Sequence, residues 1–142
     1  LLIFELRPPV LEELGLIGAL QKRVEMVENR AGIQAEVSVV GEPNLPEDVE
    51  NQLYWVVYEA LSNVLKHARA KHVSLRFVFS DGRITVILHD DGVGFNPTTI
   101  NQRIGGGLKN IIDRVESIGG KLDVDSRLGE GTSIRIVLDE ID

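Results

Sequence analysis

The sequence contains no cysteine, which excludes disulfides, thiolate metal ligands and thiol nucleophiles together. It also lacks any apolar run approaching the roughly 18 to 20 residues that a membrane-spanning helix needs, so this stretch of chain is not expected to cross a membrane. No cluster of Lys or Arg offsets the net charge of −7, which argues against a nucleic-acid partner. An anionic ligand would therefore need hydrogen-bond donors placed locally. The absence of cysteine favours a reducing, cytoplasmic compartment.

The chain of 142 residues fits one domain that can bury about two-thirds of the surface exposed on unfolding. It starts LLIFEL, without methionine, and we interpret it as a piece of a longer protein that can itself be membrane-anchored. Consecutive prolines at positions 8 and 9 exclude a regular helix there. We therefore predict a linker over residues 1–9 and a single domain over residues 10–142.

Hydrophobic periodicity predicts helices over residues 10–31, 46–68 and 108–118. Alternating or β-branched segments predict strands over residues 35–40, 73–79, 84–89, 121–127 and 132–138, the last four forming two hairpins. The expected fold is a two-layer α/β sandwich in which a mixed sheet of about five strands has three helices on one face.

Four residues follow one another along the second predicted helix, beside its apolar face, at positions i, i+4, i+7 and i+8: Glu59, Asn63, Lys66 and His67. An amide oxygen is a hard, neutral ligand that suits Mg²⁺. A carboxylate one turn earlier could orient or deprotonate a nucleophile beside that ion. The alternative is a solvated helix edge without any ligand.

A second candidate follows the strand over residues 84–89, where Asp90, Gly92 and Gly94 alternate. A buried carboxylate at a strand end can accept a hydrogen bond from an exocyclic amine, and glycines let the backbone pass close to a flat ring. Adenine carries such an amine, whereas guanine has a carbonyl oxygen at that position, which would face the carboxylate as a second acceptor. Losing this hydrogen bond would favour adenine over guanine by about 5- to 150-fold in affinity. The alternative is a plain turn.

Two further glycine segments complete the set: Gly105-Gly106-Gly107-Leu108 before the third predicted helix, and Gly129-Glu130-Gly131-Thr132 within the second hairpin. Free N–H groups at a helix start can bind phosphate oxygens, and a threonine in the hairpin turn could reach a ligand or a bridging water. The first segment is neither a P-loop nor a dinucleotide-binding fingerprint. Taken alone, each segment is also consistent with glycines that only form a turn or separate secondary-structure elements.

In this order and spacing the four segments resemble the catalytic ATP-binding domain of two-component sensor histidine kinases. This domain has the Bergerat fold shared with gyrase, MutL and the heat-shock chaperones, and the resemblance covers nearly the whole chain. Residues 59–67 match the N box, residues 90–94 the G1 box, residues 105–108 the G2 box and residues 129–132 the final glycine-threonine element. Arg7-Pro8-Pro9 further resembles the nitrate-sensor branch, as does the short segment over residues 95–104, which has no phenylalanine-rich box.

The resemblance implies that Asn63 binds Mg²⁺ and that Asp90 recognises the adenine amine of ATP, with support from Thr132 through water. It implies that Lys66 or His67 contacts phosphate. Glu59 would help an acceptor histidine attack the γ-phosphate, as a catalytic residue with Asn63 and Lys66, or would activate water as in the related ATPases.

The glycines have implied roles as well. Gly92 and Gly94 would admit the nucleotide, and Gly105 and Gly107 would give a lid its reach, with Leu108 completing that nucleotide-binding segment.

No histidine of the chain matches the family's phospho-acceptor, which lies in a helix directly before an acidic residue. His67 belongs to the N box, His72 begins a predicted strand, and His89 lies on a strand before Asp90. The chain is therefore expected to transfer the γ-phosphoryl of Mg-ATP to a histidine on a separate dimerisation domain of a homodimeric parent, upstream of a response regulator. The alternatives are an ATPase, a serine kinase acting on an anti-sigma antagonist, and a nucleotide-holding module without chemistry, none of which needs the Arg7-Pro8-Pro9 linker.

Overall fold

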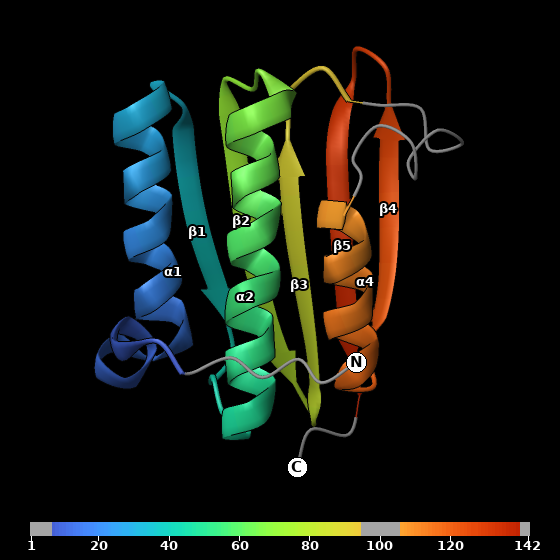
Figure 1. Ribbon diagram of the computed structural model, residues 1–142. Helices are drawn as coiled ribbons and strands as arrows, with labels where there is room; N and C mark the ends of the chain where they lie inside the picture. The colour runs from blue at the N-terminus through green and yellow to red at the C-terminus, as the bar shows by residue number, and fades with distance from the viewer. Residues whose placement is uncertain (1–6, 95–105, 140–142) are drawn as a thin grey trace.

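The computed structural model describes residues 7–94 and 106–139. Figure 1 shows one layer of helices lying across one face of a sheet, which confirms the two-layer α/β sandwich. The elements in chain order are α1 (Pro9–Ala31), β1 (Gln34–Val40), α2 (Glu47–Asn63), the π-helix η1 (Val64–Ala68), β2 (His72–Ser80), β3 (Arg83–Asp90), α4 (Gly106–Ser117), β4 (Lys121–Arg127) and β5 (Gly131–Leu138).

The sheet has the strand order β1-β2-β3-β5-β4, and both predicted hairpins are present as β2–β3 and β4–β5. Only the β1–β2 pair is parallel among the described strands, so the sheet is mixed. A parallel pair needs a crossover connection, and α2 with η1 supplies it. Because β3 pairs with β5, the end of one hairpin lies directly against the turn of the other.

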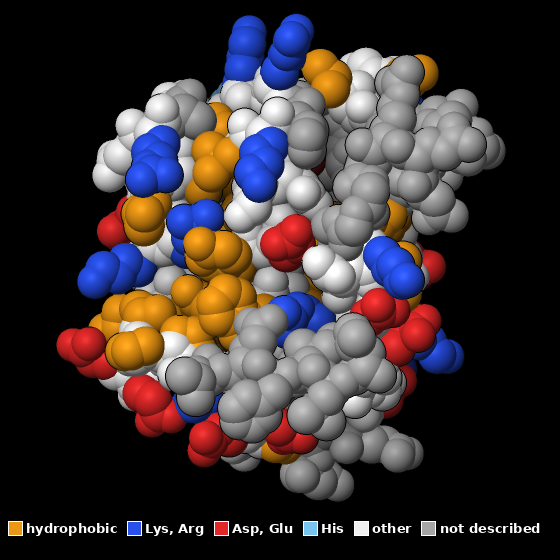
Figure 2. Space-filling view, in the orientation of Figure 1, with side chains coloured by type: hydrophobic (Ala, Val, Ile, Leu, Met, Phe, Trp, Pro, Cys, Tyr) orange, Lys and Arg blue, Asp and Glu red, His pale blue; other side chains and the backbone are white. Residues whose placement is uncertain are grey.

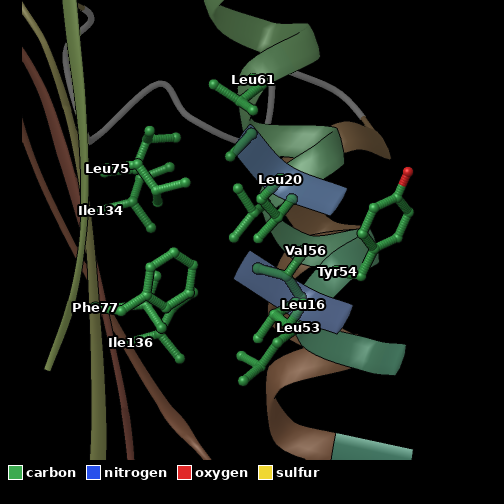
Figure 3. Close-up of a cluster of buried hydrophobic side chains, with 14 of the residues drawn as sticks. Leu16, Leu20, Leu53, Tyr54, Val56, Leu61, Leu75, Phe77, Ile134 and Ile136 are labelled. Atoms are coloured by element: carbon green, nitrogen blue, oxygen red, sulfur yellow. The ribbon is translucent and has the colours of Figure 1, made fainter. Parts of the chain in front are cut away.

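The core lies between the sheet and the helices. Alternate residues of β2 and β3 are buried, which is the period of a strand with one covered face. Figure 3 shows Phe77 of β2 and Ile136 of β5 facing Leu53 and Val56 of α2, while Tyr54 points away from the sheet. Phe77 and Leu53 are fully buried, so the predicted apolar face of the second helix is the face that packs on the sheet.

The start of the described chain is held against α2. The Arg7 side chain pairs with the carboxylate of Glu50, and its Nη1 donates to the backbone oxygen of Glu47 at 3.3 Å. Pro8 precedes the first turn of α1, which is bent at Gly15, where φ is +72°. The predicted linker over residues 1–9 stays a prediction, since residues 1–6 lie outside the described part of the chain.

The second predicted helix is not α-helical throughout. The α-helix ends at Asn63, and the next five residues form η1, which ends at Arg69 with φ of +51°. A π-helix forms i→i+5 hydrogen bonds and has more residues per turn than an α-helix. Glu59 and Asn63 therefore keep their i, i+4 relation on α2, and Lys66 lies on η1.

Candidate functional site

The predicted site residues gather at one end of the sheet. Figure 1 shows the end of α2, the end of β3 and the turn between β4 and β5 at the same end of the molecule, the upper end in this view. Asp90, the last residue of β3, is directly opposite Thr132 of β5. Three of the four segments identified in the sequence are thus brought together although up to about 70 residues separate them.

Asp90 is the centre of this cluster. Its side chain is only 5% exposed, and it faces the helices because it follows the buried positions of β3. Burial raises the pKa of this carboxyl, while the N–H groups of Gly92 and Thr132 oppose the rise by donating to it. The Gly92 N–H is 2.9 Å from Oδ1, which closes an Asx turn. A carboxylate has room for further donors beyond these two, so Asp90 can accept a ligand's N–H.

Asp91, which the sequence did not single out, joins the end of β3 to the start of β2. Its Oδ1 accepts the N–H groups of Lys71 at 2.8 Å and His72 at 2.9 Å, and its Oδ2 is 2.9 Å from Nδ1 of His72. The Asp91 N–H in turn donates to the His72 carbonyl at 3.2 Å. The hydrogen bonds from His72 lower the pKa of Asp91 to about 2. The chain that leaves η1 is therefore tied to the G1 segment.

The glycines of two predicted segments pack against each other. Gly94 has φ of +64°, and a Cβ there would lie 2.1 Å from the Arg127 carbonyl oxygen. Gly131 has φ of +86°, and its Cβ would lie 2.2 Å from the Asp90 carbonyl oxygen. The N–H of Gly129 also donates to the Val93 carbonyl at 2.6 Å. Close backbone packing already requires glycine at positions 94 and 131, whatever a nucleotide requires.

Ser126 is a second residue of this site that the sequence did not single out. It is 3% exposed, and its Oγ is 2.7 Å from Oγ1 of Thr132. The Ser126 hydroxyl also donates to the Gly131 carbonyl at 3.2 Å. The signal was available in the sequence, because Ser126 has the inward parity of Leu122 and Val124 on β4.

The N-box residues lie on α2 and η1. Glu59 and Asn63 are half-buried one turn apart, and Lys66 on η1 is exposed. The His67 side chain lies outside the described residues. No group of three or more His, Asp or Glu that could hold a metal exists among the residues described. An ion at Asn63 would therefore take its other ligands from water and from the bound molecule.

The electrostatics of the helical face differ between its two ends. Figure 2 shows Lys and Arg side chains at the end that carries the site and mostly Asp and Glu toward the opposite end. The exposed cations around the exit of η1 are Lys66, Arg69 and Lys71. The net charge of −7 therefore coexists with a local group of cations suited to an anionic ligand.

The G2 segment is described only in part. Gly105 and the expected lid over residues 95–104 lie outside the described residues, whereas Gly107 belongs to the first turn of α4. Leu108 is 5% exposed and lines a cavity of about 480 Å³ between α4 and β4.

Cavities in the described part of the chain lie at both ends of the sheet. One of about 210 Å³ lies beside Thr132, between Arg127 and His89. Another of about 600 Å³ lies between the β1–α2 connection and the β2–β3 turn, and none of its lining residues was predicted to bind a ligand. Size therefore does not identify the site; the clustering of the predicted residues does.

Comparison with known proteins supports this arrangement. A family model described as "Histidine kinase-, DNA gyrase B-, and HSP90-like ATPase" matches residues 48–142. The chain belongs to this family. Family membership implies ATP as the nucleotide, and it confirms the resemblance inferred from the N, G1, G2 and glycine-threonine segments.

Curated relatives of this chain are named as histidine kinases. An "Uncharacterized sensor-like histidine kinase" from Chloroflexus aurantiacus is 34% identical over 143 residues, which cover 95% of this chain and 24% of the relative. The kinase/phosphatase DegS from Brevibacillus brevis is 36% identical over 137 residues, covering 95% of this chain and 35% of DegS. The chain thus spans about a quarter to a third of the relatives' length.

Solved structures show the same fold. The histidine kinase domain of a blue-light activated kinase from Erythrobacter litoralis superposes with a TM-score of 0.76 at 23% identity, covering 92% of this chain and 68% of that chain. The mycobacterial sensor histidine kinase MprB gives 0.65 at 26% identity, covering 84% of this chain and 91% of that chain. No helix among the residues described is both long and apolar enough to cross a membrane.

Proposed function

We propose that this chain binds Mg-ATP and transfers the γ-phosphoryl group to a histidine on another domain of its parent protein. The observation that carries the proposal is Asp90, a buried carboxylate that keeps acceptor capacity opposite Thr132, at the end of the molecule where α2 also ends. Family membership implies ATP as the nucleotide, and the curated relatives named as histidine kinases suggest a histidine as the acceptor.

The roles follow from the chemistry of the side chains. Asp90 accepts a hydrogen bond from the adenine amine, and Thr132, directly opposite, supports that contact through water. Lys66 or His67 contacts phosphate at the cationic end of the helical face. Glu59 lies one turn before Asn63 and would help an acceptor histidine attack the γ-phosphate. Transfer of this kind depends mainly on positioning and on neutralising charge.

The donor set at the end of α2 fits Mg²⁺. Asn63 offers a neutral amide oxygen, and the described part of the chain provides no carboxylate cage around it. Mg²⁺ commonly keeps several waters and binds through one or two protein groups plus substrate phosphates. The ion would neutralise the β- and γ-phosphate oxygens, and Asn63 would hold it beside the phosphate that Lys66 or His67 contacts.

The acceptor histidine and its partners belong to the parent protein. His72 pairs with Asp91, and His89 lies on the open face of the sheet with its Nδ1 2.7 Å from Oγ of Ser133. Neither stands in a helix followed by an acidic residue. The proposal therefore places the acceptor on a dimerisation domain, in a homodimeric cytoplasmic kinase module that passes the phosphoryl group to a response regulator.

The decisive experiment mixes this chain with Mg-ATP labelled at the γ-position and a separate acceptor-helix domain from a related kinase. Acid-labile, base-stable label on that domain is the expected result, because phosphohistidine hydrolyses in acid. Release of labelled phosphate without labelled protein would instead support an ATPase, the alternative in which Glu59 would activate water.

A further inference from the structure

The connection that leaves η1 is held at one residue from two sides. Arg69, directly after η1, has φ of +51°. Two residues later, the N–H of Lys71 donates to Oδ1 of Asp91 at 2.8 Å. The carbonyl of Lys71 accepts the N–H of Gln34, the first residue of β1, at 2.9 Å. Residues 69 and 70 alone therefore separate η1 from this fixed residue.

The carboxylate that holds the connection belongs to the G1 segment. Asp90, the predicted adenine-binding residue, faces the helices, whereas the neighbouring Asp91 contacts the connection that leads into β2. Oδ1 of Asp91 accepts the N–H of His72, at 2.9 Å, as well as that of Lys71. Both donors are backbone N–H groups, so the direction of these two hydrogen bonds is fixed. One carboxylate thus links the adenine end of the predicted site to the exit of η1.

We propose that Asp91 is a positioning residue that holds the phosphate-contacting part of η1 in place relative to Asp90. It would thereby raise the affinity for the phosphates of the nucleotide and leave the affinity for its base unchanged. The inference rests on the proposed contacts of adenine with Asp90 and of phosphate with Lys66 or His67. If the exit of η1 were released, nucleotide binding would have to order it again, and such ordering lowers affinity.

The backbone after η1 supports this role. A non-glycine residue in the left-handed region, such as Arg69, is strained and persists where the surrounding structure holds it. The two hydrogen bonds of Lys71, to Asp91 and from Gln34, lie two residues further along the chain. Loss of the Asp91 carboxylate would therefore release one side of the structure that keeps this strained exit in place.

A purely structural role for Asp91 makes a different prediction. Loss of a contact that only stabilises the fold would lower the free energy of unfolding without changing how much the phosphates add to affinity. Loss of the negative charge would act in the opposite direction, because removing a carboxylate near the site favours an anionic ligand. The ratio of the affinities for ADP and adenosine therefore separates positioning from both other effects.

The first test uses calorimetry on the whole chain with adenosine and with ADP, with Mg²⁺ present throughout. For Asp91→Ala we expect the ratio of ADP affinity to adenosine affinity to fall about 3- to 10-fold, the effect of one hydrogen bond. The Asp91 side chain is 41% exposed, so this variant leaves no buried cavity and should fold. Asp91→Asn is the matched control, because it removes the same charge but keeps an oxygen that can accept both N–H groups. Its ratio should equal or exceed that of the wild type.

Amide hydrogen exchange on the wild-type chain tests the same link without any substitution. Coupling between two binding events is reciprocal, so hydrogen bonds that favour phosphate binding must themselves be stabilised by bound phosphate. ADP should therefore slow exchange at the N–H groups of Lys71 and His72 more than adenosine does at equal saturation.

Three results would overturn the inference alone: a wild-type ratio in Asp91→Ala, a fall in Asp91→Asn as large as that in Asp91→Ala, or equal protection of the Lys71 and His72 N–H groups by ADP and adenosine. A wild-type chain that binds ADP no more tightly than adenosine would overturn the proposed phosphate contact, and the inference with it. A chain that binds neither ligand would overturn the proposed site itself. The labelled-phosphate experiment addresses transfer separately, so a failure of transfer leaves these measurements unaffected.

Discussion

Asp90 and Asp91 are neighbouring carboxylates whose environments shift their pKa values in opposite directions. Burial raises the pKa of Asp90, whereas the hydrogen bonds from His72 lower that of Asp91 to about 2. The difference arises because Asp90 faces the helices and Asp91 faces the connection that leads into β2. The Asp90 carboxylate is thereby available to a ligand, whereas the Asp91 carboxylate is occupied by the backbone N–H groups of Lys71 and His72.

At this residue scale, Asp90→Asn should abolish binding of ADP and ATP in calorimetry while the chain stays folded. The amide can present a donor to the adenine amine, and two donors facing each other lose the contact that the carboxylate would make. Because burial disfavours the charged form of Asp90, the neutral amide should not lower the unfolding midpoint.

The matched control is Asp81→Asn, an exposed aspartate in the β2–β3 turn at the other end of the sheet, where φ is +48° and asparagine is well tolerated. It should bind nucleotide like the wild type. Retained ADP affinity in Asp90→Asn would remove Asp90 from the site.

At the scale of elements, the G1 segment and the β4–β5 turn form one interlocked unit. Gly131→Ala should lower the free energy of unfolding by about 1 to 3 kcal/mol, since the new Cβ meets the Asp90 carbonyl oxygen at 2.2 Å and the strands must separate. ADP binding should weaken with it, because the shift moves Asp90. Urea unfolding and calorimetry measure the two effects.

Gly129→Ala provides the control within the same turn. Gly129 also has a positive φ, +80°, but nothing lies within 4 Å of a Cβ placed there. Gly129→Ala therefore introduces the backbone strain of a positive φ without a steric clash. Equal losses of stability and affinity in the two variants would show that the contact with Asp90 is unimportant.

The junction between α2 and η1 positions the proposed metal ligand. Asn63 is the last residue of α2, and the π-helix begins directly after it, an irregularity that is frequent at functional sites. Asn63→Asp should abolish Mg-ATP-dependent phosphoryl transfer while the circular dichroism spectrum is unchanged, because a charge replaces a neutral ligand beside the phosphates.

Asn44→Asp makes the same chemical change at an exposed position on the β1–α2 connection, at the opposite end of the sheet. It should leave transfer unaffected. Transfer at the wild-type rate in Asn63→Asp would exclude the assigned role.

At the scale of the whole molecule, acid stability should depend on the contact that Asp91 makes between β2 and β3. Its pKa falls from 3.8 to about 2 on folding, so its contribution is fully present above about pH 4 and is lost as the pH falls through about 2. Asp91→Asn should therefore reduce unfolding stability at about pH 6 and make the decline between about pH 4 and pH 2 shallower. Urea midpoints over this pH range test it.

Asp81→Asn again serves as the control, since Asp81 makes no comparable set of contacts among the hydrogen bonds of the described chain. Its pH profile should follow the wild type. A profile for Asp91→Asn that is parallel to the wild type down to about pH 2 would show that the carboxylate contributes no charge-dependent stability.

Much of the fold and of the site follows from local patterns. The periodicity of the apolar residues predicted the helices and strands, and the order of the four segments predicted the family, which the comparison confirms. Periodicity could not reveal the π-helix, because a change from i+4 to i+5 bonding leaves no compositional mark between Asn63 and Arg69. The α-helix predicted over residues 46–68 therefore changes to η1 after Asn63.

The sequence by itself determined which chemistry is available: an acidic strand end at Asp90, an amide at Asn63 and glycines where the backbone must pass closely. Only the tertiary structure decided that β3 pairs with β5, because strand pairing depends on contacts far apart in the chain. That pairing places Ser126 two strands from Asp90 and joins them through Thr132. It also packs Gly131 against the Asp90 backbone, so that the same residues close the core and shape the site.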